Sequence, residues 1–258
     1  TAVEDEVLTA VNTLSDEDVL GTITYTWSNG TIGETTTLGQ SDVGSALTVT
    51  ASYTDGQGGA ESVTSIGTSV VVNVNDAPIG SVTISGTAVE DGVLTAANTL
   101  TDEDVLGTIT YTWSNGAIGE TTTLGQTDVG SVLSVTASYT DGQGSGESVS
   151  SEATGSVVNV NDAPIGSVTI SGTAVEDEVL TAVNTLSDED VLGTITYTWS
   201  NGTIGETTTL GQTDVGSVLS VTASYTDGQG SGESVSSEAT GSVVNVNDAP
   251  IGSVTISG

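Results

Sequence analysis

The sequence predicts an all-β protein made of tandem β-sandwich domains that follow one another end to end as a rod. Two observations support this fold class. The segment TAVEDEVLTA at Thr1 returns as TAVEDGVLTA at Thr87 and unchanged at Thr173, so the 258 residues hold three copies with a period of 86 (87 minus 1). This period exceeds that of a solenoid unit and approaches a small independent domain. Short Thr-, Val- and Ile-rich runs alternate with Gly, Asn and Asp turns, and no long helical period appears.

Each predicted strand of the first copy is a β-type run that a turn signal closes. Asn29-Gly30 and Asp55-Gly56 accept positive φ and favour tight hairpins. Ile23, Tyr25 and Trp27 alternate with threonines, so we expect them to point into the core. The predicted strands cover residues 6–13, 21–28, 35–39, 45–54 and 61–75.

The central strand carries a further signal. Tyr25 and Trp27, followed by the turn Asp42-Val43-Gly44 and another alternating strand, resemble the immunoglobulin-like sandwich. In that strand order the segment SVTISG is the first strand of a domain, and it precedes each later TAVED segment. We therefore expect a repeat at 1–77 without its own first strand, complete repeats at 78–163 and 164–249, and the first strand of a following repeat at 250–258.

The charge balance is one-sided. The chain has 34 Asp and Glu residues and no Lys, Arg or His, so it cannot neutralise its own carboxylates. Self-repulsion on this scale opposes compaction, and bound cations would relieve it. Disorder is the competing interpretation of such an acidic chain. The 35% of hydrophobic residues, arranged in alternation, argue against disorder, although a looser chain without metal is compatible with the composition.

The same composition excludes several functions. No His, Cys or Lys is present as a base, nucleophile or Schiff-base amine, so we predict that the protein is not an enzyme. Nucleic acid and anionic membranes would be repelled, and no apolar run reaches the length of a membrane helix. Without cysteine, only packing and metal remain to stabilise domains of this size.

The acids gather at the two ends of each predicted sandwich, on either side of the linker VNVNDAP. Hard oxygen ligands in this number, without His or Cys, favour Ca²⁺ over zinc, copper or iron. The expected ligands at the first linker are Glu4, Asp5, Asn75, Asp76, Asp102, Asp104 and Asp141, and at the second Glu90, Asp91, Asn161, Asp162, Asp188, Asp190 and Asp227. The matching positions at the outer ends are Asp16, Asp18 and Asp55 in the first copy and Glu176, Asp177, Asn247 and Asp248 in the third.

This constellation resembles the cadherin junction, where an acidic linker of the form D-x-N-D-x-x-P, a D-x-D loop and a preceding glutamate bind calcium. Here NVNDAP supplies Asn73, Asn75, Asp76 and Pro78, and DED supplies Asp102 and Asp104. Asn73 replaces the first aspartate of the linker motif, so one charge is lost and the number of ions per junction is open.

The pattern NDAP, GSVTISGTA, YTW, DVG and SYTDGQG is similar across each repeat to the tandem extender domains of giant bacterial RTX (repeats-in-toxin) adhesins and biofilm surface proteins. The resemblance implies an extracellular place on the bacterial surface and calcium-stiffened arrays of further copies. We predict a structural array stiffened by Ca²⁺. One alternative is a glycan- or cell-binding module acting through the sandwich loops. Another is a fibre in which chains are joined by donor-strand addition.

Overall fold

The computed structural model describes residues 1–258 and contains β-strands joined by turns and loops. The chain divides into two compact units. The first comprises Thr1–Thr87, Val93–Thr122 and Val132–Gly155, and the second comprises Ala88–Gly92, Thr123–Ser131 and Ser156–Gly258. No helix has the length and apolar character needed to cross a membrane.

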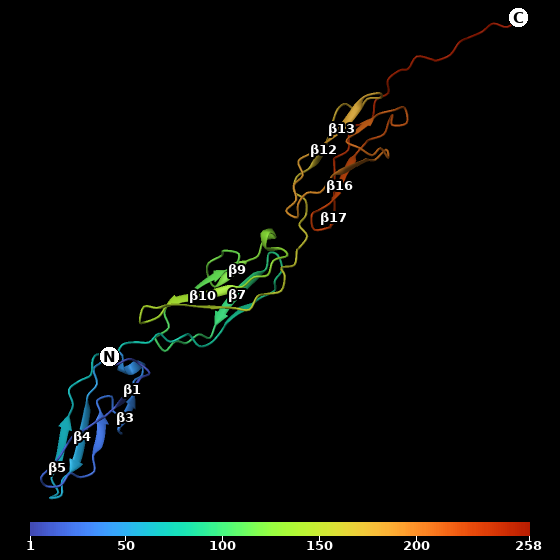
Figure 1. Ribbon diagram of the computed structural model, residues 1–258. Coiled ribbons are helices and arrows are strands. Elements are labelled where there is room, and N and C mark those ends of the chain that lie inside the picture. The colour runs from blue at the N-terminus through green and yellow to red at the C-terminus, as the bar shows by residue number, and fades with distance from the viewer. The chain divides into compact units, whose positions relative to one another are not determined.

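The same strands recur at each copy of the sequence (Figure 1). In the first repeat they are β1 (Val7–Thr9), β2 (Thr24–Trp27), β3 (Thr35–Thr37), β4 (Val49–Thr54) and β5 (Ala60–Thr64). In the middle repeat they are β6 (Val82–Ser85), β7 (Val93–Asn98), β8 (Thr110–Trp113), β9 (Thr121–Thr123), β10 (Val135–Thr140) and β11 (Gly146–Ser150). In the third they are β12 (Val168–Ser171), β13 (Val179–Asn184), β14 (Thr196–Trp199), β15 (Thr207–Thr209), β16 (Val221–Thr226) and β17 (Gly232–Ser236). Short 3₁₀ turns, η1 (Gln40–Asp42) and η2 (Gln126–Asp128), follow β3 and β9.

The strands of a repeat form two antiparallel sheets. In the third repeat one sheet has the order β12-β13-β15 and the other β14-β16-β17, and the middle repeat has the matching orders β6-β7-β9 and β8-β10-β11. In the first repeat the sheets are β1-β3 and β2-β4-β5. The predicted class, all-β with tandem sandwiches, is confirmed.

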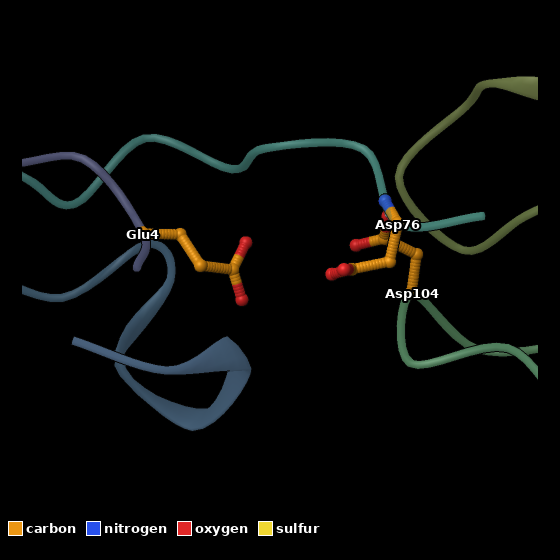
Figure 2. A group of neighbouring side chains, drawn as sticks. All are labelled: Glu4, Asp76 and Asp104. Carbon is orange, nitrogen blue, oxygen red and sulfur yellow. The ribbon is translucent and has the colours of Figure 1, made fainter. Parts of the chain in front are cut away.

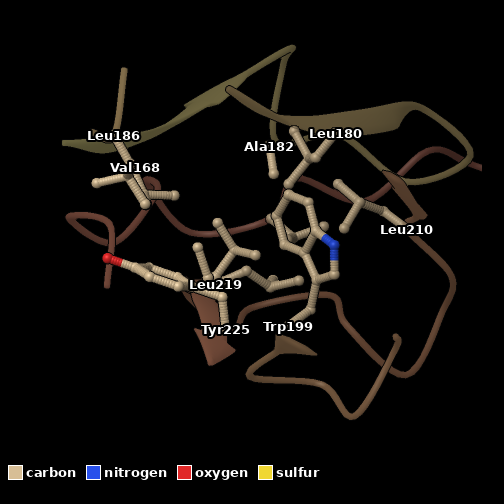
Figure 3. Close-up of a cluster of buried hydrophobic side chains, with 11 residues drawn as sticks. Val168, Leu180, Ala182, Leu186, Trp199, Leu210, Leu219 and Tyr225 are labelled. Carbon is tan, nitrogen blue, oxygen red and sulfur yellow. The ribbon is translucent and has the colours of Figure 1, made fainter. Parts of the chain in front are cut away.

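The alternation predicted for the central strand produces the core. Trp199 is 1% exposed and stands in register with Val221 of β16, and both pack among Leu180, Leu210 and Leu219 (Figure 3). The indole Nε1 donates a 3.0 Å hydrogen bond to the carbonyl of Gly205, which satisfies its only polar atom. Burial of this large apolar surface is the main force holding each sandwich together.

The last predicted strand is shorter than expected. Of residues 61–75, only those up to Thr64 are in a strand, β5. Farther along, Val71 and Val72 form isolated parallel bridges with Val43 and Val3. Between Thr64 and Val71 the chain leaves its antiparallel pairing with β4 and takes up parallel pairing with Val43 and Val3, so the strand is interrupted. The change brings the linker beside the turn that carries Glu4.

Candidate metal centre

Two groups of three carboxylates come together, one in each compact unit. The first comprises Glu4, Asp76 and Asp104, and the second comprises Glu90, Asp162 and Asp190. In each group, one oxygen of every residue lies within 4.8 Å of the others. Figure 2 shows the Glu4 carboxylate pointing toward those of Asp76 and Asp104. Each group combines a turn, a linker and a loop from distant parts of the sequence.

Glu4 is positioned by the parallel bridge between Val3 and Val72. Its backbone N–H donates to the carbonyl of Val72 at 3.0 Å, and its Oε2 accepts the N–H of Val74 at 3.0 Å. The next residue, Asp5, has a φ of 63° and reverses the chain. The glutamate is 3% exposed, so its second oxygen is held in a fixed direction beside the linker.

Asp104 lies in the loop between β7 and β8 and is fully buried. Its N–H donates to Asp102 Oδ1 at 2.9 Å, and its carbonyl accepts the N–H of Gly142 at 2.8 Å. Val105 has a φ of 73°, which is an unfavourable backbone angle for a β-branched residue. The bonds around the loop hold this strained turn in place.

Asp76 connects the linker to this loop. Its N–H donates to Asp104 Oδ2 at 2.8 Å, and Asp162 makes the same bond to Asp190 Oδ2 at 2.9 Å. These bonds fix one oxygen of each buried aspartate and leave the linker carboxylate half-buried beside it. The two groups therefore share the same backbone construction.

The electrostatics of both groups are unfavourable for three bare carboxylates. Burial raises the pKa of Glu4; the Val74 hydrogen bond opposes this shift, and the charges of Asp76 and Asp104 add to it. Burial and then the charge of Asp104 raise the pKa of Asp76. Asp162 has a raised pKa for the same reasons, with Asp190 as the neighbour. The chain has no cationic side chain, so any compensating positive charge would have to be bound.

Buried oxygens without a hydrogen-bond donor mark the same places. Asp104 Oδ1 and Asp141 Oδ2 are buried and unpartnered. The other such atoms are Gln40 Oε1, Asn73 Oδ1, Gln126 Oε1, Asn159 Oδ1 and Asp227 Oδ2. Asn73 and Asn159 lie on the linkers, and Gln126 donates to Asp190 through its amide nitrogen. A buried acceptor without a partner is costly and uncommon. A cation would supply the missing partner.

The donor set fits a hard cation. All the candidate atoms are carboxylate or amide oxygens, which suits Ca²⁺ with its six to eight oxygen ligands. Mg²⁺ also takes oxygens but requires a stricter octahedron. The chain has no nitrogen or sulfur side chain of the kind that zinc and copper prefer.

Other predicted ligands support these groups or lie beside them. Asp102 accepts the Tyr139 hydroxyl on Oδ2, while Asp141 Oδ1 accepts the N–H of Ser145 at 2.8 Å. In the second unit Tyr225 donates to Asp188, and Asp227 Oδ1 accepts the N–H of Ser231. The predicted turn residues Asp5, Asp91 and Asp177 are exposed and have positive φ. These aspartates hold the loops and turns in shape.

The linker asparagines contact residues that sequence reasoning did not identify. Asn75 donates through Nδ2 to Glu147 Oε1 at 2.8 Å, and Asn161 does the same to Glu233 at 2.9 Å.

A glutamine outside the linkers also contacts a candidate ligand: Gln126 Nε2 donates to Asp190 Oδ1 at 3.1 Å. The recurrence of Gln two residues before DVG was the available signal for the glutamine.

The matching acids at the outer ends form no three-carboxylate group. They are Asp16, Asp18 and Asp55 in the first repeat and Glu176, Asp177, Asn247 and Asp248 in the third. Asp18 is exposed, and Asp248 is exposed as well. Asp42 is occupied within its own repeat, where it accepts the N–H of Gly39 at 3.1 Å and the amide of Asn29 at 3.2 Å.

No protein-family model and no curated protein matches the sequence. Among solved structures, the chain is similar to a tetra-tandem repeat in the extending region of a large adhesion protein, with 25% identity, 87% of this chain and 67% of that chain covered, and a TM-score of 0.28. It is also similar to a Ca²⁺-stabilized adhesin that helps an Antarctic bacterium bind ice. The two are 19% identical, the match covers 93% of this chain and 68% of the adhesin chain, and the TM-score is 0.29. The third similar structure is that of the extracellular cadherin domains 1–4 of protocadherin gamma B7. The two are 13% identical, the match covers 91% of this chain and 66% of the protocadherin chain, and the TM-score is 0.28.

Proposed function

We propose that the chain is part of an extracellular repeat array in which Ca²⁺ bound at each linker fixes one sandwich relative to the next. The observation that carries the proposal is the pair of buried carboxylate groups, each with a ligand from a turn, a linker and a following loop. One ion bound to all three would restrict the linker through its own coordination bonds.

Removal of calcium would release the linker again. Three carboxylates within 4.8 Å of one another repel when no cation lies between them. Asp76 and Asp162 sit on the linkers, so repulsion there acts directly on the segments that join the repeats. The array would be stiff with calcium and loose without it.

The position of the array on a bacterial surface adhesin or matrix fibre is part of the same proposal. Its support is the similarity of the repeat sequence to extender domains of large adhesins. Three near-identical copies suit a spacer, whose length depends on the number of units. A glycan- or cell-binding role through the loops stays the alternative, and binding of the chain to a glycan array would favour it.

Small-angle scattering of the whole chain in calcium and after chelation tests the mechanical part. We expect a longer, narrower distribution of interatomic distances in calcium and a broader one after chelation. An unchanged distribution would overturn the proposal.

The linker variants make the test specific. Asp76→Asn with Asp162→Asn should give the chelated profile even in calcium. Asp248→Asn is the matched control, since it occupies the same linker position but belongs to no carboxylate group. It should behave as the unmodified chain. If the control loosened the array as much as the double variant, general charge and not the two groups would be responsible.

A further inference from the structure

A glutamine contacts the second carboxylate group from a fourth element of the chain. Gln126 is the first residue of η2, and its Nε2 donates to Asp190 Oδ1 at 3.1 Å. The other oxygen of this fully buried aspartate, Oδ2, accepts the N–H of Asp162 at 2.9 Å. The middle repeat and the linker therefore each donate one hydrogen bond to the carboxylate that the third repeat contributes.

Backbone hydrogen bonds hold Gln126 beside the turn that carries Glu90. The N–H of Asp91 donates to the carbonyl of Leu124 at 2.9 Å, and the N–H of Leu124 donates to the carbonyl of Gly92 at 2.9 Å. The segment that leads into η2 and the turn of the glutamate are thus bonded to each other in both directions. Glutamate and glutamine approach the group from the same repeat as one unit.

The amide oxygen of this glutamine is buried without a partner. Gln126 Oε1 accepts no hydrogen bond, although Nε2 of the same amide is bonded to a carboxylate. The amide carries both atoms on one carbon, so Oε1 lies near the Asp190 carboxylate that Nε2 contacts. The reversed amide would set Oε1 against that carboxylate, with two acceptors in contact. Oε1 is therefore an acceptor at the group that a cation can satisfy.

The first carboxylate group has the equivalent glutamine. Gln40 is the first residue of η1, and its Oε1 is also buried without a partner. Asp104, which corresponds to Asp190, is fully buried and has an unpartnered Oδ1. The same two backbone hydrogen bonds join Leu38 to the turn that carries Glu4. Both groups thus combine a buried loop aspartate with a buried, unsatisfied amide oxygen.

We propose that Oε1 of Gln40 and Oε1 of Gln126 are each a ligand of the cation held by the adjacent carboxylate group. This inference rests on the proposed function, because it adds a ligand to the same calcium sites. Side-chain amide oxygens are among the ligands that Ca²⁺ takes, and this one adds coordination without a fourth negative charge. The middle repeat would then hold the third repeat twice, through the ion and through the hydrogen bond from Gln126 to Asp190.

Terbium luminescence of the whole 258-residue chain tests the ligand role. Tb³⁺ takes the same hard oxygen ligands, and its luminescence lifetimes in H₂O and D₂O count the water molecules on the ion. Gln40→Met with Gln126→Met removes both amide oxygens and keeps the length of the side chains. We expect about one more water on each ion and a calcium affinity lower by about tenfold, measured by calorimetric titration.

Gln143→Met with Gln229→Met is the matched control. These two glutamines lie in the TDGQG turns, whose preceding glycines bond to the loops of Asp104 and Asp190, but both are exposed. The control should keep the water count and the calcium affinity of the unmodified chain.

A second pair of variants separates coordination from hydrogen bonding. Gln40→Glu with Gln126→Glu keeps an oxygen at each position and removes the donor to Asp190. Ligand glutamines predict an unchanged water count and an equal or higher calcium affinity. The proposal is overturned if the methionine pair leaves the water count unchanged, or if the glutamate pair gains a water as the methionine pair does.

The result can be told apart from that of the proposed function. A chain that binds ions and stiffens in calcium, with the same water count in the methionine pair, would overturn the ligand role alone. Ion binding with the expected water counts and an unchanged scattering profile would overturn the mechanical function alone. An unmodified chain that binds no ion would overturn both.

Discussion

The first and middle repeats carry the same acidic loop sequence in different surroundings. Asp18 and Asp104 occupy the same place in the motif DEDVLG, yet Asp18 is exposed and Asp104 is fully buried. The loop around each is built alike, because Val19 and Val105 share a φ of 73° and both loops bond to the glycine of the following TDGQG turn. The difference is the linker and the glutamate that precede the middle repeat. A loop of this sequence becomes a candidate site only when another repeat supplies the other two carboxylates.

The largest expected effect concerns two equivalent core leucines, Leu94 of the middle repeat and Leu8 of the first repeat. Leu94→Ala should lower the free energy of unfolding of the middle repeat by about 2–5 kcal/mol, since the leucine is fully buried. Leu8→Ala should cost the first repeat about half as much or less, because Leu8 is only half-buried.

Urea unfolding followed by fluorescence measures this difference. Each repeat holds one tryptophan, so variants that keep only Trp27 or only Trp113 report one repeat at a time. The comparison fails if the two alanine variants lose equal stability.

The second effect concerns the loop aspartates. Asp104→Asn should remove or weaken by more than about tenfold one of the two proposed calcium sites, because it takes a charge from a buried three-carboxylate group. Asp18→Asn should leave both sites unchanged. Calorimetric titration of the calcium-free chain gives stoichiometry and affinity for each variant. Equal losses in the two variants would mean that the loop binds calcium without the linker.

The third effect is a dependence on pH that changes sign with calcium. Burial and neighbouring carboxylates raise the folded-state pKa values of Glu4 and Asp76 above their ordinary 4.5 and 3.8. The folded state therefore holds these protons more tightly than the unfolded state does. Without metal, this contribution to stability is present at low pH and is lost as the pH rises through the raised values.

The proposed calcium ion would bind only the ionised carboxylates, so the calcium affinity should rise with pH over the same interval. Thermal unfolding of the metal-free chain and calcium titrations between about pH 4 and 7 measure the two trends. Glu4→Gln should flatten both, and Glu6→Gln, an exposed glutamate outside the group, should not. Parallel trends with and without calcium would contradict this account.

The smallest effect concerns the contact between a linker asparagine and a strand glutamate. Glu147→Gln should weaken the hydrogen bond from exposed Asn75 and lower stability by about 0.5 kcal/mol, as a solvent-screened contact allows. The same change at Glu61, the equivalent residue of the first repeat, should have no effect on its repeat. Thermal unfolding in calcium compares them, and a larger loss at Glu61 would contradict the contact's role.

Much of the fold could be predicted from local pattern. Alternation placed Tyr25 and Trp27 on one face, and Asn-Gly and Asp-Gly marked turns, because both signals act over a few residues. The break after Thr64 could not be predicted, since it follows from parallel pairing with residues far away in sequence. Of the seven residues expected at the first linker, the structure brings three carboxylates together. Asp102 and Asp141 look the same in sequence, but Asp102 Oδ2 accepts the Tyr139 hydroxyl and Asp141 Oδ1 accepts the N–H of Ser145, so only Asp141 Oδ2 is left without a partner.

The strained valine of the DEDVLG loop is present in all three repeats. Val19, in the repeat whose loop has no linker beside it, adopts the same backbone angle as Val105 and Val191. The loop is thus preorganised when its own repeat folds, before any neighbour contributes a ligand. Little of the conformational entropy of the loop remains to be lost on binding, which favours affinity. Under the proposed function, the linker would be the part of the site that an ion has to order, so binding the ion and immobilising the joint would be one event.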